Sequence, residues 1–390
     1  MPQKTPELEN MLAKLIATPS VSCVDAELDM SNRPVAELAA NWLAGIGFSV
    51  EIIDVTDFPG KVNLIATLGQ GDSGLVLAGH LDTVPAGTPG WRDDPFRLRR
   101  QDGDFIGLGT ADMKSFIAVA VAAASRFKAG DLKEPLIILG TADEESSMCG
   151  GKALVQAGRP RARHAIIGEP TGLRPIRAHK GILFEAIRVH GAAGHSSNPA
   201  LGHNALEGMH RVMQTLMTLR AELARDWSNP AFDVPNPTLN FGHLHGGDTP
   251  NRICADAELH IDLRTLPGMP LQKFRDIIRQ RVTEALENSP FTVSFVPLFD
   301  GVDAMETPAT APLVQALESM TGHAAAAVAF STEGPYLREL DMDVVICGPG
   351  DIGQAHQPEE RVSEQALAQS QAQLETLIEK FCVRPGQAEQ

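Results

Sequence analysis

The stretch Pro135-Leu-Ile-Ile-Leu-Gly-Thr-Ala-Asp-Glu-Glu145 decides the fold, because an apolar run ends directly in three acidic residues. The run from Leu136 to Leu139 has the composition of a strand that is buried on both faces. A solvated acidic turn is the ordinary interpretation of a short charge run. Its position directly behind a core-like strand favours a functional site instead.

Four other apolar runs also end in chemically active side chains. They lead into His80 and Asp82, into Asp112, into Glu169, and into the loop that carries His356. In open α/β sheets, ligands bind outside the carboxyl ends of the strands. Imidazole and carboxylate together suit a hydrolytic metal such as zinc.

Length and composition limit the class of protein. With 390 residues, 43% hydrophobic and 21% charged, the chain has the size of two domains and the composition of a soluble globular protein. A net charge of −16 argues against nucleic acid or an anionic membrane surface as a partner. Five widely spaced cysteines without a C-x-x-C pair, no apolar leader and no transmembrane stretch predict a cytoplasmic protein.

The pattern of elements changes twice along the chain. Strands and helices alternate over residues 1–181 and again over 298–390, which predicts a largely parallel, mixed α/β sheet flanked by helices in one catalytic domain. Residues 182–297 follow the order β-α-β-β-α-β of a ferredoxin-like module, and we expect them to form an inserted α+β dimerisation or lid domain. The module's edge strand and first helix suggest a homodimer.

Several of the chemical residues have two interpretations. A lone His80 is more often a core histidine, but Asp82 could hold the second ring nitrogen of a metal-bound imidazole. Asp112 could cap the helix that follows it or bridge two metal ions. Glu144 and Glu145 leave the strand in different directions, so one can bind metal while the other acts as a general base.

Three further positions are less sharply defined. The proline after Glu169 fixes its turn, and His356 lies in a Gly/Pro-rich loop of the kind that carries function. His195, in the inserted module, is either a surface histidine or an oxyanion stabiliser. The glycines before Asp112 match only half of a dinucleotide fingerprint, which leaves a dinucleotide-binding enzyme as a remote alternative.

Taken together, the motifs resemble those of the di-zinc amidohydrolase and peptidase family over essentially the whole chain. The resemblance rests on Gly79–Pro85, Gly109–Lys114, Thr141–Glu145 and Gly168–Thr171. It is narrowed by Arg177–Gly181, His245–Ile253, Ser331–Gly334 and Gly348–Pro358 to a bacterial branch that deacetylates N2-acetyl-L-ornithine in arginine biosynthesis.

The resemblance implies a ligand set for two Zn²⁺ ions, for which Co²⁺ could substitute. One zinc takes His80 and Glu169, and the other takes Glu145 and His356. Asp112 bridges both ions, with a water or hydroxide between them, and the peptide bond after it is cis.

The resemblance also implies roles around the metals. Asp82 orients His80, and Glu144 is the acid/base. Asn251 and Arg264 look like the pair that receives the substrate carboxylate, and His195 acts in the site of the partner subunit.

The choice of substrate is the least determined expectation. Leu108, Ser115 and Gly334 differ from the residues common in relatives, although none is an expected ligand. We expect Glu333 to be the counter-charge of the ornithine ammonium. Rival functions are a broader N-acyl-amino-acid deacylase or a succinyl-diaminopimelate desuccinylase, and, from another class, a metal-binding scaffold without catalysis.

Overall fold

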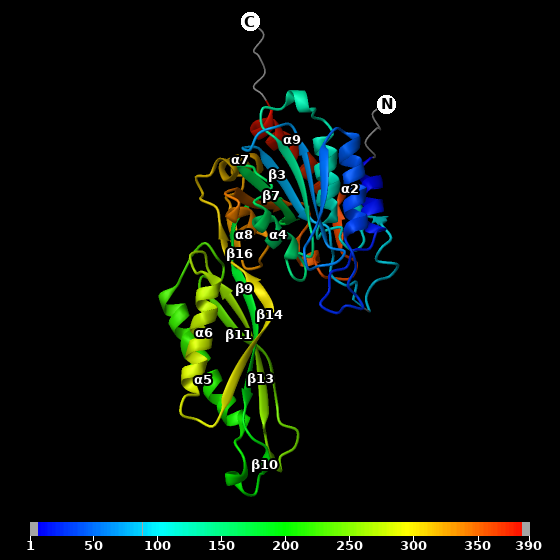
Figure 1. The fold of residues 1–390 in the computed structure, drawn as a ribbon. Coiled ribbons are helices and arrows are strands. Elements are labelled where there is room, and N and C mark those ends of the chain that lie inside the picture. Colours follow the sequence, from blue (N-terminus) through cyan, green and yellow to red (C-terminus); the bar gives the residue numbers. More distant parts are fainter. Residues whose placement is uncertain (1–6, 88, 384–390) are drawn as a thin grey trace. The chain divides into compact units, whose positions relative to one another are not determined.

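The computed structural model describes residues 7–87 and 89–383 of the chain (Figure 1). The chain divides into two compact units. Unit 1 comprises Met1–Arg177, Thr307–Ala326 and Glu333–Gln390, and unit 2 comprises Ala178–Glu306 and Ala327–Thr332. The expected insert, 182–297, lies inside unit 2. Unit 2 begins before residue 182 and ends after residue 297 because the chain passes from one unit to the other within paired strands. The chain enters unit 2 a second time at 327–332, and no sequence pattern predicts this.

Unit 1 is built on a sheet whose central strands are parallel. The strand order is β1 (Ser49–Asp54), β2 (Val62–Leu68), β6 (Leu136–Thr141), β3 (Leu75–His80), β7 (His164–Pro170) and β17 (Asp343–Gly348). Strands β3, β6, β7 and β17 run parallel, and β2 is antiparallel to both of its neighbours. The parallel strands are buried along their whole length, as continuous apolar runs predict. The expected largely parallel sheet is confirmed.

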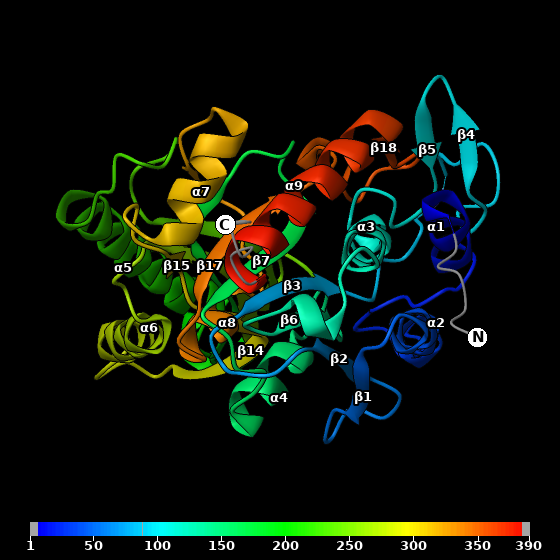
Figure 2. The ribbon, with the colours of Figure 1, turned by 90° about the horizontal axis from the view of Figure 1, so that it is seen from above.

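Helices cover both faces of this sheet (Figure 2). One face shares a hydrophobic core with α1 (Leu8–Ile16), α2 (Arg33–Gly45), α3 (Lys114–Ala124), α7 (Pro312–Thr321) and α9 (Glu364–Cys382). The other face carries α4 (Cys149–Ala157) and α8 (Gly334–Glu339). Helix α3 is buried almost all round, which explains why its sequence is apolar on every side.

A small antiparallel sheet lies beside this core in unit 1. Its order is β18 (Arg361–Ser363), β5 (Asp104–Ile106) and β4 (Arg99–Gln101). Short 3-10 turns occur at Ala129–Asp131 and Ile352–Gln354. Strand β5 leads into the loop before Asp112, and the chain reaches β18 directly after Glu360. The small sheet therefore brings these two segments together.

Unit 2 has the ferredoxin-like order that the sequence predicts. Its antiparallel sheet runs β11 (Thr238–Gly246), β13 (Asp256–Thr265), β9 (Gly181–His190) and β14 (Thr292–Val302), and α5 (Ala205–Asp226) and α6 (Leu271–Ala285) cover one face. Burial alternates along β13, so the other face of the sheet is open and polar.

Several short elements complete unit 2. Strand β10 (Gly194–His195) pairs with β12 (Arg252–Ile253), and a 3-10 turn spans Pro199–Leu201. Strands β15 (Met305–Glu306) and β16 (Ala326–Val328) pair with β8 (Ile176–His179), in which the chain leaves unit 1.

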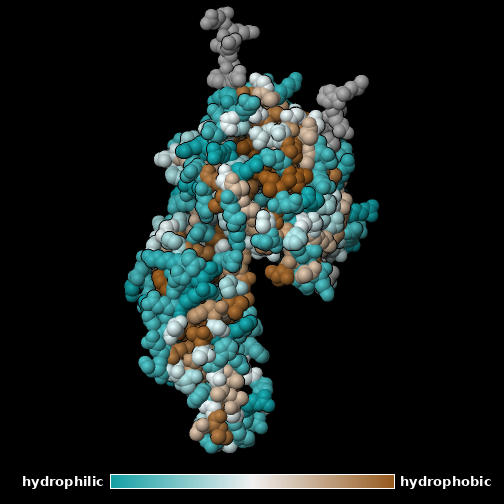
Figure 3. All heavy atoms as spheres, in the orientation of Figure 1, coloured by the Kyte–Doolittle hydropathy of each residue, from teal (hydrophilic) through white to brown (hydrophobic). Residues whose placement is uncertain are grey.

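The surface in view is mostly hydrophilic with separate hydrophobic areas (Figure 3). Within the described ranges, no helix has the length and apolarity needed to cross a membrane. The five cysteines are free of disulfide bonds.

Candidate metal centre

The expected metal ligands all lie in unit 1, at the edge where the parallel strands end. His80 is the last residue of β3, Glu169 lies at the end of β7, and Glu145 follows β6. Asp112 precedes α3, and His356 follows β17. Parallel strands deliver their carboxyl ends to one edge, which is why residues so far apart in the sequence meet there.

His80 is buried and makes different contacts through its two ring nitrogens. Its Nε2 lies 2.9 Å from Oδ1 of Asp112 and 3.7 Å from Oε1 of Glu169. Its Nδ1 lies 3.1 Å from the carbonyl oxygen of Asp82 and 3.6 Å from Oδ1 of the same residue. Asp82 thus occupies the Nδ1 side, and Nε2 is directed toward the two carboxylates.

Asp112 is shared between the two histidines. Its Oδ1 faces His80, and its Oδ2 lies 3.4 Å from Nε2 of His356. That nitrogen of His356 is also 3.0 Å from Oε2 of Glu145. The structure therefore contains two imidazole–carboxylate pairs, His80 with Glu169 and His356 with Glu145, and Asp112 offers one oxygen to each.

Asp112 is not the cap of the following helix. Helix α3 begins at Lys114, its N-cap is Met113, and it has no side-chain capping bond. The capping alternative is wrong because both oxygens of Asp112 face the histidines. The peptide bond between Asp112 and Met113 is cis, as the resemblance implies.

Glu360 holds the backbone before Asp112, and sequence reasoning missed it. It is only 1% exposed. Its carboxylate accepts the N–H groups of Gly109 at 3.0 Å, Ala111 at 2.7 Å and Asp112 at 2.9 Å. The Glu359-Glu360 pair ahead of a short strand resembles a solvated charge run, so only the fold distinguishes the buried member.

The turn with the two glutamates is tied to β3 by Asp82. The Asp82 carboxylate accepts the backbone N–H of Glu144 at 3.3 Å and of Glu145 at 3.2 Å. Asp82 therefore positions His80 and the acidic turn at the same time. Glu145 faces His356, whereas Glu144 and Glu169 form a second cluster with His80.

A buried ion pair supports the same turn and was also missed. Asp143 has a left-handed backbone with φ of 60°, and its side chain lies 2.8 Å from Nζ of Lys61. Lys61 also pairs with Asp29 at 2.6 Å, and Ser22 donates to Asp143 at 2.6 Å. In the sequence Asp143 is just the first acid of a run of three, and nothing local indicates its partner.

The cluster has the electrostatics of a cation site. Burial, followed by neighbouring carboxylates, raises the pKa of Glu144 and Glu169 well above the ordinary range and that of Glu145 to about 7. Hydrogen bonds to Asp112 and Glu145 raise the pKa of His356 to about 10. Acids crowded together favour protonation, and imidazoles beside carboxylates hold a proton more tightly, so the cluster stabilises positive charge.

The donor set fits divalent metal ions. Imidazole nitrogens and carboxylate oxygens are the ligands of zinc, cobalt and manganese in hydrolytic sites. Ligand atoms of His80, Asp112 and Glu145 lie within 4.8 Å of one another, as do those of His80, Glu144 and Glu169. No thiolate is among them.

Glu333 is the buried residue directly before α8. It is 3% exposed, and its Oε1 has no hydrogen-bond partner. Burial raises the pKa of Glu333 to about 7, and its charge in turn raises the pKa of Glu144 and Glu169. The expected ammonium counter-charge therefore acts electrostatically on Glu144 and Glu169.

His195 and Asn251 lie together in unit 2. The side chain of His195 is exposed and accepts a hydrogen bond from the Ser197 hydroxyl at 2.7 Å. The backbone N–H of Ser196 donates to the carbonyl of Asn251 at 3.2 Å, and Asn251 accepts at its side chain from Thr249. The pairing of β10 with β12 thus brings His195 and Asn251 close together.

Arg264 lies elsewhere in unit 2, away from Asn251. Arg264 lies near the C-terminal end of β13, which pairs with the start of β9. Asn251 precedes the N-terminal end of β13, which begins at Asp256. An extended strand rises ~3.3 Å per residue, which separates Asp256 from Arg264 by about 26 Å. One chain therefore does not bring Asn251 and Arg264 together as a pair. Arg264 instead bonds Asp262 at 2.8 Å.

The profile of peptidase family M20/M25/M40 matches residues 76–380. The chain therefore belongs to this family and is a metal-dependent amidohydrolase.

Particular relatives match nearly the whole chain. Acetylornithine deacetylase of Edwardsiella ictaluri is 45% identical over 384 residues, 98% of this chain and 100% of the relative. Acetylornithine deacetylase of Pasteurella multocida is 43% identical over 380 residues, 97% of this chain and 99% of the relative.

Solved structures show the same fold at low sequence identity. An M20 family metallo-carboxypeptidase of Sulfolobus solfataricus has a TM-score of 0.76 at 16% identity and covers 96% of this chain and 99% of its own. A dinuclear metal-binding M20 peptidase of Bacillus subtilis has a TM-score of 0.65 at 15% identity, with 95% and 96% covered.

Proposed function

We propose that the protein hydrolyses N2-acetyl-L-ornithine to L-ornithine and acetate, as a step of arginine biosynthesis. The observation that carries this proposal is the Asp112 carboxylate shared between two imidazole–carboxylate pairs, in a chain 43–45% identical to acetylornithine deacetylases. Free cysteines support a cytoplasmic setting.

The proposed centre holds two Zn²⁺ ions, or Co²⁺ as a substitute. His80 and Glu169 would hold one ion, Glu145 and His356 would hold the other, and Asp112 would be shared between them. The contacts within each pair, and the two oxygens of Asp112, support this division. When bound, the ions lower the pKa of a water toward neutrality and polarise the acetyl carbonyl.

Glu144 is the proposed acid/base of the reaction. It accepts a proton from the attacking water and delivers a proton to the leaving amine nitrogen. Its backbone is held by Asp82, and burial together with Glu169 raises its pKa, which suits a group that must carry a proton between steps. Asp82 acts through His80 and the acidic turn, as a positioning residue.

The two charged ends of the substrate require opposite partners. Glu333 is buried, with one oxygen unpaired, and we assign it to the ornithine ammonium. Arg264 is assigned to the substrate carboxylate, because a guanidinium can bind a carboxylate with two N–H groups. Arg264 now donates two hydrogen bonds to Asp262 and would have to give up one of them to bind the substrate.

His195 and Asn251 are assigned to the site of the partner subunit in a homodimer. They lie together and far from Arg264 along β13, so the two sets serve different sites. Strand β11 is an edge strand. Leu244 on β11 and Leu206 and Met217 on α5 are 51%, 41% and 42% exposed. An uncovered edge with apolar neighbours is a surface suited to pairing with a second copy.

A substrate panel tests the activity. Steady-state rates are measured on N-acetylornithine, N-succinyl-diaminopimelate and N-acetylmethionine with zinc-loaded enzyme. The proposal requires the highest kcat/KM on N-acetylornithine. A higher kcat/KM on the succinyl compound would establish the desuccinylase. Similar kcat/KM values on both acetyl compounds would establish the broader deacylase. No turnover on any of the three would establish the inactive scaffold.

A further inference from the structure

The open face of the unit 2 sheet carries a second group of metal-ligand side chains. His243 and His260 are directly opposite each other on β11 and β13, and Glu258 lies two residues before His260 on the same strand. Residues two apart on a strand point to the same face, and directly opposite Cβ atoms lie about 4.5–5.5 Å apart. The three side chains therefore start from a small triangle on a paired, rigid ladder.

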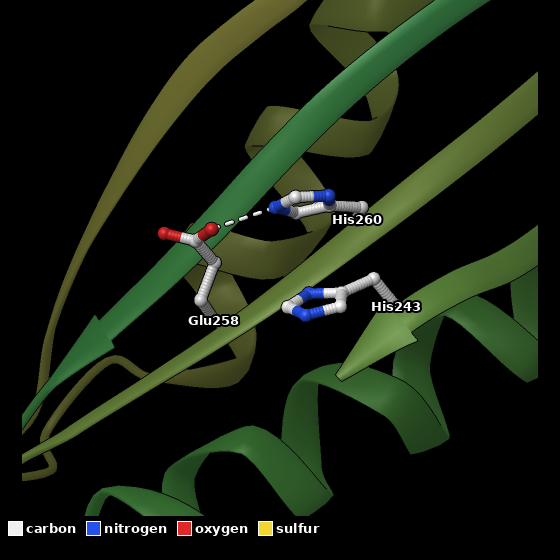
Figure 4. A group of neighbouring side chains, drawn as sticks. All are labelled: His243, Glu258 and His260. Carbon is white, nitrogen blue, oxygen red and sulfur yellow. Dashed lines mark hydrogen bonds and ion pairs between the residues drawn. The ribbon is translucent and has the colours of Figure 1, made fainter. Parts of the chain in front are cut away.

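The side chains converge from that triangle (Figure 4). Nε2 of His260 lies 2.6 Å from Oε1 of Glu258, and the two imidazole rings have centroids 4.5 Å apart at an angle of 38°. One ligand atom from each of the three residues lies within 4.8 Å of the others. The three residues could therefore hold a single ion.

The surroundings suit an ion that enters from solvent. The side chains of His260 and Glu258 are 30% and 29% exposed, and the face is hollowed by about 510 Å³ beside Arg188, His190, His243, His245, Asp256 and Glu258. Hydrogen bonds from His260 and Arg188 lower the pKa of Glu258, which keeps its carboxylate ionised. Arg188 also anchors the second oxygen of Glu258, as supporting residues do for metal-binding carboxylates.

We propose that His243, Glu258 and His260 bind one borderline divalent ion, such as Zn²⁺, in addition to the centre of unit 1. The cation replaces the proton that His260 and Glu258 share, His243 provides the third ligand, and water completes the coordination. A surface ion pair between His260 and Glu258 would explain that contact alone. It does not account for the second imidazole, His243, whose ring centroid lies 4.5 Å from that of His260.

Bound metal would link β11 to β13 directly after the shift in strand register between Phe241 and His243. This part of the ladder is the least regular of the β11–β13 pairing. The ion should therefore stabilise unit 2, since a ligand that binds only the folded state raises the unfolding temperature. The same ion should be lost in acid, because protons compete for the imidazoles.

The experiment compares zinc content in four full-length proteins after equilibrium dialysis against buffered free Zn²⁺. These are wild type, His243→Asn, Glu258→Gln and the control His210→Asn, an exposed histidine on α5. We expect the two site variants to hold one Zn²⁺ fewer per chain than wild type and His210→Asn at about pH 7.5. The difference should vanish at about pH 5.5, below the ordinary histidine pKa.

Two further readouts separate the site from the rest of the molecule. Added Zn²⁺ should raise the melting temperature of wild type more than that of either site variant, and hydrolysis of N-acetylornithine should change less than about twofold. Equal zinc content in wild type and His243→Asn would overturn the proposal. Loss of the same ion from His210→Asn would overturn it as well, because the binding would then be unspecific.

Discussion

The Glu360 carboxylate accepts the backbone N–H of Asp112 at 2.9 Å, across a separation of 248 residues in the chain. Asp112, which contacts both histidines, is thus held by Glu360 from the last chain segment of unit 1. The same carboxylate binds the N–H groups of Gly109 and Ala111, so the whole approach to Asp112 is fixed by one side chain.

Glu360→Gln should weaken metal retention. The amide replaces one acceptor oxygen by a donor, which faces N–H groups and displaces the backbone of Asp112. Loss of such supporting contacts costs about 10–100-fold in metal affinity. Metal content is measured after dialysis against graded chelator, with the half-buried neighbour Glu359→Gln as control, because Glu359 pairs with Arg99 and not with the backbone before Asp112. Retention equal to wild type would show that Asp112 does not depend on Glu360.

Glu144→Gln should retain metal and lose turnover. The amide cannot carry a proton, and general acid–base catalysis contributes about 10²–10⁴-fold. The measurements are kcat on N-acetylornithine and metal content on the same sample. If the variant loses metal in parallel with activity, Glu144 is a ligand and its assigned role is wrong.

Glu333→Gln should change substrate preference. Removing the buried charge should raise KM for N-acetylornithine, whose ammonium loses its counter-charge, and leave N-acetylmethionine unaffected. An effect of ~10-fold corresponds to one charge-assisted contact of about 1.4 kcal/mol. Glu339→Gln, on the exposed side of α8, is the matched control. An unchanged ratio between the two substrates would remove Glu333 from the substrate site.

Lys61→Met should destabilise unit 1. It leaves Asp143 as an uncompensated buried charge, and breaking a buried pair on one side costs about 3–5 kcal/mol. Denaturant unfolding measures the loss. Because Asp143 shapes the turn before Glu144, activity should fall even where the variant is folded. A cost below ~1 kcal/mol would mean that the pair is solvated in the working protein.

Mixed dimers test the assignment of His195 to the partner's site. His195→Ala and Glu144→Gln should each be inactive as homodimers. After subunit exchange in equal amounts, half of the dimers are mixed, and each mixed dimer has one intact site, so about one quarter of wild-type activity should return. Absence of recovery, with exchange verified by mass, would place His195 in its own subunit's site or outside any site.

The residues proposed to bind the substrate mark where sequence reasoning stops. Arg264 and Asn251 are close in the chain and look like one pair, but the rise of β13 places them far apart. Glu360 and Lys61 carry no local signal at all, because their importance comes from partners that are distant in the chain. The cluster of His243, Glu258 and His260 likewise depends on strand register, which depends in turn on a local irregularity in β11.

The sequence by itself determined the parallel sheet, the ferredoxin-like module and the group of candidate metal ligands. The sheet and the candidate ligands follow from apolar runs that lead into His80, Glu145 or Glu169, and the module follows from the order of its strands and helices. Only the tertiary structure decided which oxygen of Asp112 faces which histidine, and that Glu360 holds it in place. Strand ends follow from nearby residues, whereas contacts between side chains depend on how distant segments pack.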